Sequence, residues 1–223
     1  MACMGKMNTV SHMVLGAPIL LARQGLLHIS REFPRIPDIN RRKCTAVKER
    51  SKDACMLLPC DAEFFAIVVD RVGGVYIKPH GADEIIYRMQ PQFASIARLL
   101  PGDSACLVIV YHCNSGKLHM GVYDLTRLSG VDLKAKTLLE RHAILHETVS
   151  FNFKQFQDLC HQQGAPPRSA WEANVWVFWV GWQEACVNVV AHSTDLPFKP
   201  AYICRLDDEE YVKLLTPIRT SWP

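Results

Sequence analysis

Apolar and polar positions along the chain predict pairs of strands that alternate with helices. Residues 55–77 form two runs rich in β-branched and aromatic residues about Gly73 and Gly74, which is the pattern of a hairpin. Residues 105–112 and 117–125 predict a second hairpin. Later apolar runs predict further strands, most of them buried, at 174–182, 185–193 and 200–206.

Three segments between these strands carry apolar residues at helical spacing, and they are 91–102, 129–149 and 153–164. The second segment begins as a turn, and the third ends at a glycine cap. In the second helix the residues expected on the apolar side are Leu138, Leu139, Ile144 and Leu145.

These elements predict an irregular N-terminal arm, 1–53, followed by one domain, 54–223. The fold class is α+β, with mainly antiparallel sheets and packed helices. Composition agrees with a globular chain, because 49% of the residues are apolar and the formal net charge is only +3. A basic run at 41–52 is read as a solvated segment rather than a phosphate-binding face.

Cysteine usage and the N-terminus bear on the compartment. The nine cysteines are odd in number and include no C-x-x-C pair, and no secretory signal opens the chain. We therefore expect a reducing, intracellular compartment, no disulfide framework and no metal site. The first acid is Glu32, and acid-poor starts occur in mitochondrial presequences. The mitochondrion is one interpretation, with nucleus or cytoplasm as alternatives. No apolar run is long enough to cross a bilayer, so we expect no membrane partner.

The stretch GVYDLTRLSGVDLKAKTLLERHAILHE, 121–147, resembles a region of ATP-dependent polynucleotide ligases. There a strand ending in aromatic-Asp-Leu leads through x-G-x-D-L into a helix headed by L-L-E-R. The resemblance implies membership of the covalent nucleotidyltransferase superfamily, which includes the mRNA capping guanylyltransferases, and the fold of a ligase adenylation domain. It also implies that Tyr123 packs on a nucleotide base.

Other motifs of that superfamily align in the expected order, but each is altered. The K-x-D-G-x-R motif falls on 59–64, where Pro59 replaces the nucleophilic lysine and Asp61 is kept. Lys78 stands where the superfamily has an arginine near a glycine. Glu172 heads a stretch similar to E-G-x-V-x-K, and Arg205 is the basic residue of the final K-x-K position. The resemblance therefore makes Asp61, Lys78, Tyr123, Glu172 and Arg205 candidate nucleotide or RNA contacts.

Covalent nucleotidyl transfer needs an amine nucleophile, a metal and cations on the leaving pyrophosphate. Pro59 supplies no nucleophile, so we expect a pseudoenzyme with no catalytic residues, no metal and no cofactor. Such a protein would bind RNA, a nucleotide, an RNA cap or other proteins as a subunit of a ribonucleoprotein. We expect no OB-fold domain after 210.

Two alternatives stay open. The chain is a purely structural or interaction subunit of a large complex without nucleotide binding, or, less favoured, an active RNA ligase or guanylyltransferase with a displaced nucleophile such as Lys52 or Lys78. The tryptophans of 171–182 suit either base stacking or core packing.

Overall fold

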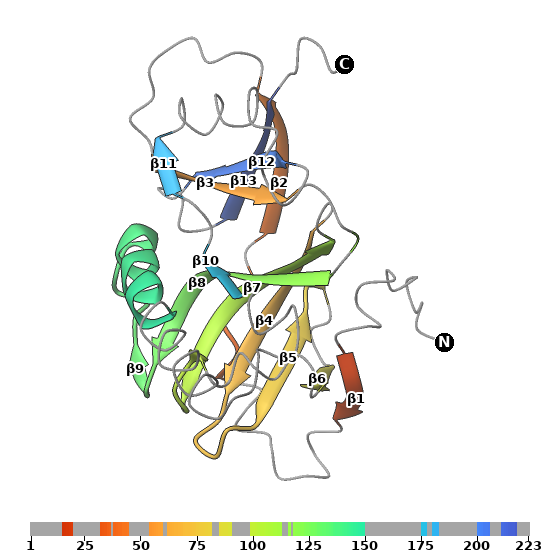
Figure 1. Ribbon diagram of the computed structural model, residues 1–223, viewed down its shortest axis with the longest axis vertical. Helices are drawn as coiled ribbons and strands as arrows, with labels where there is room; N and C mark the ends of the chain where they lie inside the picture. Colours follow the sequence, from red (N-terminus) through yellow and green to blue (C-terminus); the bar gives the residue numbers. More distant parts are fainter. Residues whose placement is uncertain are drawn as a thin grey trace, which may run out of the picture.

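The computed structural model describes residues 15–19, 32–36, 38–44, 54–59, 62–81, 85–90, 99–112, 116, 118–149, 175–177, 180–182, 200–205 and 211–217. In this part of the chain the backbone forms two β-sheets and a helix at residues 138–149 (Figure 1).

The larger sheet has eight strands, of which seven lie in the order β1-β6-β5-β4-β7-β8-β10. The eighth, β9, pairs with β8. Every pairing is antiparallel except that of β10 with β8, which is parallel. The strands are β1 (Leu15–Ile19), β4 (Glu63–Val69), β5 (Val75–Pro79), β6 (Ile86–Met89), β7 (Ser104–His112), β8 (Leu118–Leu128), β9 (Val131–Asp132) and β10 (Val175–Val177).

The smaller sheet has five strands in the order β11-β3-β12-β13-β2 and lies at the top of Figure 1. Its pairings are antiparallel apart from the parallel pair of β13 and β2. The strands are β2 (Asp38–Cys44), β3 (Ala54–Pro59), β11 (Val180–Trp182), β12 (Pro200–Arg205) and β13 (Tyr211–Pro217). The prediction of mainly antiparallel sheet is confirmed.

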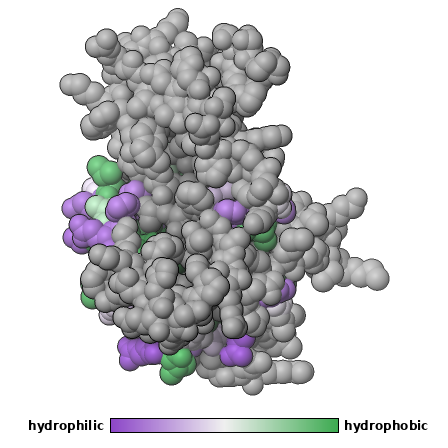
Figure 2. All heavy atoms as spheres, viewed as in Figure 1, coloured by the Kyte–Doolittle hydropathy of each residue, from purple (hydrophilic) through white to green (hydrophobic). Residues whose placement is uncertain are grey.

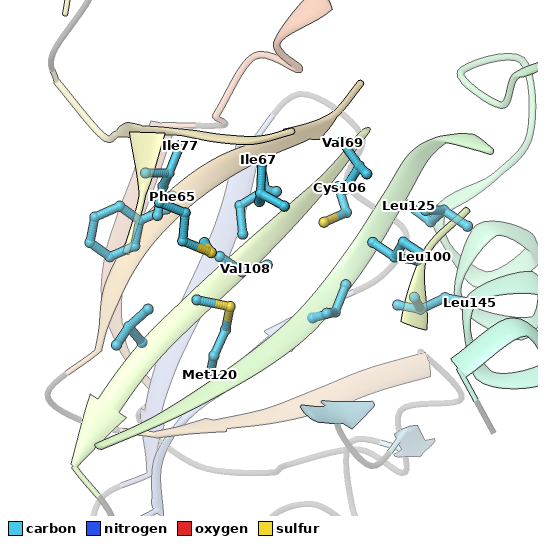
Figure 3. Packing of buried hydrophobic residues seen from close by; sticks show 14 of the residues in the cluster. Phe65, Ile67, Val69, Ile77, Leu100, Cys106, Val108, Met120, Leu125 and Leu145 are labelled. Carbon is cyan, nitrogen blue, oxygen red and sulfur yellow. The ribbon is translucent and has the colours of Figure 1, made fainter. Parts of the chain in front are cut away.

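One face of the larger sheet carries the main apolar core, because side chains alternate between faces along a strand. Phe65, Ile67 and Val69 of β4 enter this core together with Cys106 and Val108 of β7 (Figure 3). The residues between them are buried as well, since all of β7 except its last residue is buried. Burial on both faces explains why β7 reads as a continuous apolar run rather than an alternating one.

The helix at 138–149 begins with a reciprocal cap. The Thr137 backbone N–H donates to Glu140 Oε2 at 2.8 Å, and the Glu140 N–H donates to Thr137 Oγ1 at 3.3 Å. Leu145 and Val149 join the core from this helix. Leu139 was expected on the buried side and is 48% exposed, so that prediction is wrong.

The two predicted hairpins are confirmed as β4–β5 and β7–β8. Two predicted strands are divided between the sheets. The first run of 55–77 forms β3 and β4, and the run 174–182 forms β10 and β11. A strand can leave one sheet for the other at a short break that periodicity alone does not reveal.

Part of the predicted arm 1–53 is regular, since β1 and β2 belong to the two sheets. The domain boundary at 53–54 stays a prediction. The predicted strand 185–193, the helix 153–164 and most of the helix 91–102 lie outside the described residues. Packing of several helices against the sheets therefore stays a prediction too.

Candidate functional site

β8 carries Tyr123, one of the five residues that the ligase resemblance singles out, and its pairing with β7 is irregular at that point. The register passes from Val122 directly to Asp124, so Tyr123 is an extra residue in β8. This is a β-bulge, which changes the alternation of side chains along the strand. As a result Val122 and Leu125, three residues apart, both enter the main core.

Tyr123 lies on the opposite face of the sheet, where it packs against Phe64. The two ring centroids are 5.7 Å apart and the ring planes meet at 81°, an edge-to-face contact. Phe64 precedes the core residue Phe65 in β4, which places this contact on the face away from the main core. The tyrosine is 1% exposed. A base stacked on its ring would have to displace a side chain that now fills the position.

Asp124 and Arg141 form a buried ion pair that ties the helix to the sheet. Arg141 Nε donates to Asp124 Oδ1 at 2.8 Å, and Arg141 Nη2 donates to Oδ2 at 3.1 Å. The side chains are 6% and 11% exposed, respectively. Two parallel N–H donors on the two carboxylate oxygens make an ion pair stronger and fix the orientation of its side chains.

Burial raises the pKa of Asp124 above its ordinary value, while the Arg141 guanidinium, the Leu125 backbone and nearby His142 act in the opposite direction. Burial also raises the pKa of the Cys106 thiol, with a further contribution from the Asp124 charge. A thiol held in its protonated form is a poor nucleophile. The buried pair of Asp124 and Arg141 therefore suits a structural contact between the helix and the sheet.

Lys78 shares a face of the larger sheet with Tyr123. It is half-buried and pairs with Ala66, two residues from Phe64. Three strand spacings of about 4.8 Å separate β5 from β8. The structure thus brings Lys78 and Tyr123 to one face, too far apart to contact the same chemical group.

Pro59 and Arg205 belong to the smaller sheet. Pro59 is buried and pairs with Pro200, whereas Arg205 pairs with Cys55 at the other end of the same ladder. Asp61 and Glu172 lie outside the described residues. The described part of the chain therefore does not assemble the candidate contacts into one site.

Metal and membrane features can be stated for the described residues alone. They contain no group of three or more His, Cys, Asp and Glu residues that could hold a metal ion. They also contain no helix that is both long and apolar enough to span a bilayer.

Two residues that shape this region were not singled out from the sequence. Phe64 stands at the position of the arginine in K-x-D-G-x-R, and Arg141 is the last residue of the L-L-E-R stretch. A signal existed for the ion pair, because Asp124 is an acid inside an otherwise apolar strand and such a charge needs a partner.

No protein-family model matches the sequence, and no curated protein matches it. Among solved structures, the chain is similar to the ligase domain of M. tuberculosis LigD. The match has a TM-score of 0.49 and 11% sequence identity, and it covers 81% of this chain and 58% of that chain. The chain thus spans less than two thirds of the length of that structure.

Proposed function

We propose that this chain is a non-catalytic protein that acts by binding, as a subunit of a larger assembly. The observation that carries the proposal is the environment of Tyr123. Phe64 packs edge-to-face with the ring on which the resemblance places the nucleotide base, and the tyrosine is 1% exposed. Tyr123 is thus kept as a core residue, which supports a protein that has retained the fold and lost the nucleotide.

The groups around the motif positions support the absence of catalysis. Covalent nucleotidyl transfer needs an amine at the nucleophile position, and the residue there is the buried Pro59. The Cys106 thiol, in the main core of the larger sheet, is fully buried and has a raised pKa, which disfavours the thiolate. Neither side chain replaces the missing lysine.

A second candidate function is binding of RNA or a nucleotide on the Tyr123 face. One observation favours it, namely that Lys78 stands half-buried on that same face. A half-buried ammonium is suited to a phosphate, as the resemblance also implies for this position. We rank this function below protein binding because the base position is filled.

The test combines a covalent assay with equilibrium binding. Full-length protein is incubated with α-labelled ATP or GTP and divalent metal, and then titrated with ATP, GTP, capped RNA and uncapped RNA at two salt concentrations. We expect no covalent adduct and no saturable nucleotide binding. Lys78→Ala is the probe of the candidate face, and Lys134→Ala, at a lysine that is 70% exposed elsewhere, is its matched control.

A labelled covalent adduct would overturn the non-catalytic proposal. Saturable binding that Lys78→Ala weakens and Lys134→Ala leaves unchanged would establish the second candidate instead. Weakening by both lysine variants together with strong salt dependence would indicate only non-specific attraction to a polyanion.

The setting of this role also belongs to the proposal. We place the protein in a reducing intracellular compartment, with the mitochondrion, nucleus and cytoplasm as the candidates, and in a ribonucleoprotein assembly. Cell fractionation locates it. Sedimentation of the native complex before and after ribonuclease treatment shows whether RNA is part of that assembly.

A further inference from the structure

Lysine and arginine are unevenly divided between the two sheets. The strands of the smaller sheet contain one acid, Asp38, and five cations, which are Arg41, Arg42, Lys43, Arg205 and Lys213. The remaining described residues contain eight cations and eight acids, so their formal charges cancel. Because the whole chain has a formal net charge of +3, the excess of four cations in the smaller sheet accounts for its basic character.

The register of the smaller sheet brings three of these cations to one face. Lys213 of β13 pairs with Asn40 of β2, and Arg42 lies two residues further along β2. Paired residues and residues two apart share a face of a sheet, so Arg42 and Lys213 lie on the same face. The antiparallel register of β12 with β13, continued by one residue, sets Arg205 beside Lys213. We call Arg42, Arg205 and Lys213 the basic row.

The basic row lies on the face opposite to two buried apolar residues of β3. Arg205 pairs with Cys55 and so shares its face. Met56 and Leu58 lie on the other face, because adjacent residues of a strand alternate between faces, and they are 0% and 1% exposed. The row therefore does not belong to the side of the sheet that buries these two residues.

The positions of the basic row are close together. Directly opposed residues of neighbouring strands are about 5 Å apart, and diagonal neighbours are about 7–8 Å apart. Lys213 is opposite Arg205 and diagonal to Arg42. Like charges placed directly opposite each other destabilise a sheet. The stability of the fold therefore does not explain the row, whereas a bound anion offsets the repulsion.

Acids on this face are fewer than its cations. Asp38 pairs with Tyr211 and lies on the same face, where it compensates one of the three charges. The acidic run 207–210 connects β12 to β13 in the sequence and lies outside the described residues. Arg42 lies on β2, a strand that this run does not join. The described residues of this face thus keep an excess of two cations.

We propose that the basic row binds the phosphate backbone of a single-stranded RNA. Charge complementarity identifies the occupant, because lysine and arginine residues that neutralise phosphates supply the sequence-independent affinity for nucleic acids. Tyr211, two residues before Lys213, gives the same face an aromatic residue. Proteins that bind single strands combine such cations with aromatic residues on which bases stack.

The proposal rests on the proposed role in a ribonucleoprotein assembly, and it names the surface that contacts the RNA. Arg42 of the basic run 41–52 is thereby assigned to a phosphate-binding face, in place of the solvated segment that the sequence favoured. The basic row is separate from the face that carries Tyr123 and Lys78, since those residues belong to the larger sheet.

The experiment measures the salt dependence of RNA binding. Fluorescence anisotropy of a labelled, uncapped single-stranded RNA gives the affinity of the full-length protein at several salt concentrations. The test variant combines Arg42→Gln, Arg205→Gln and Lys213→Gln. Glutamine keeps a long polar side chain and removes the charge, and urea unfolding checks that the variant folds like the parent.

A matched control variant removes the same charge from the larger sheet and its loops. It combines Arg71→Gln, Lys134→Gln and Lys136→Gln, at residues that are all exposed. In Figure 2 the hydrophilic residues of this part lie over the helix and at the lower end of the molecule, away from the smaller sheet at the top of Figure 1. Any effect of net charge alone is therefore equal in the two variants.

The expected result is a change of slope. Each phosphate contact with a single strand contributes about 0.7 to the slope of the logarithm of the association constant against the logarithm of salt concentration. The test variant should therefore lower that slope by about 2 and raise the Kd about tenfold or more near physiological salt. The control variant should leave the slope unchanged. Each single glutamine variant of the row should lower the slope by about 0.7, which decides the question even if the triple variant does not fold.

Three results would overturn the RNA-binding face. An unchanged slope in the test variant would mean that acids such as those at 207–210 already neutralise the row. An equal loss in the control variant would leave only non-specific attraction between the protein and a polyanion. Tighter binding of single-stranded DNA or duplex RNA of the same sequence would refute the assignment to single-stranded RNA. Failure of the proposed function has a different signature, because a covalent adduct with labelled ATP or GTP would overturn the non-catalytic role whatever the salt slope.

Discussion

Replacing Arg141 by leucine should destabilise the fold by about 3–5 kcal/mol, because it leaves the carboxylate of Asp124 buried without its partner. The pair loses two hydrogen bonds of 2.8 and 3.1 Å at a site where the side chains are 6% and 11% exposed. Water can compensate little at that exposure. Leucine retains apolar bulk, so the loss reports mainly on the unpaired charge.

The penalty of Arg141→Leu should also depend on pH. Asp124 can escape its charge by binding a proton, and burial already raises its pKa in the parent protein. Removal of the guanidinium raises that pKa further. The destabilisation should therefore shrink as pH falls through the raised pKa of Asp124 in the variant.

A double-mutant cycle separates the charge from the loss of packing. Asp124→Leu combined with Arg141→Leu removes the uncompensated carboxylate and is expected to lie within about 1 kcal/mol of the parent. Arg71→Leu is the matched control, since its ion pair with Asp103 involves an arginine that is 87% exposed. That change should cost less than about 1 kcal/mol.

Urea unfolding followed by tryptophan fluorescence measures five proteins, namely the parent, Asp124→Leu, Arg141→Leu, the double variant and Arg71→Leu, with Cm and m fitted together. In one contrary result Arg141→Leu costs less than about 1 kcal/mol, and in another it costs as much as the double variant. Either result would refute a stabilising ion pair between the helix and the sheet. A changed m-value would instead show that the variant alters the compactness of one of the two states.

Three further changes test separate contacts. Burial raises the pKa of Asp124 in the folded state above its ordinary value. Between the pKa of the unfolded state and the raised pKa of the folded state, the folded protein binds the extra proton, so this group's contribution to the free energy of unfolding should fall as pH rises. Asp124→Asn should remove the fall in urea titrations across pH, and an unchanged slope would contradict the assignment. Thr137→Ala removes the helix cap and should cost about 1 kcal/mol, with faster amide hydrogen exchange confined to the first helical turn; global exchange changes would argue against a local cap. Phe64→Ala should cost about 3–5 kcal/mol by opening a cavity beside Tyr123, and a loss under about 1 kcal/mol in thermal or urea unfolding would show that the edge-to-face contact is not core.

Local periodicity was enough to predict the two hairpins of the larger sheet. The turn requires a positive φ, and Gly73 adopts a φ of +83°. The Gly-Gly pair between two apolar runs already indicates such a turn in the sequence. The helix after the turn at 129–130 was predictable for the same reason. These elements depend on residues that are close together in the chain.

The structural features that the sequence did not predict depend on contacts between residues that are distant in the chain. Leu139 fits helical spacing but is exposed, because the helix presents Leu145 and Val149 to the core instead. The division of 174–182 between two sheets depends on pairing with β8 and β3, more than fifty residues upstream. The enclosure of Tyr123 depends on Phe64 and on a bulge, neither of which alternation in β8 predicts.

The bulge in β8 also decides which residue can probe ligand binding. It places Tyr123 in the contact with Phe64 while the next residue, Asp124, anchors the helix through Arg141. A substitution at either position therefore disturbs the fold before it can report on a ligand, and lost binding in Tyr123→Ala would have two causes. Lys78 is half-buried on the same face, in the β4–β5 ladder, where it pairs with Ala66 and not with the residues of that bulge. Loss of nucleotide binding in Lys78→Ala at unchanged stability is thus the result that would reassign this face from structure to ligand recognition.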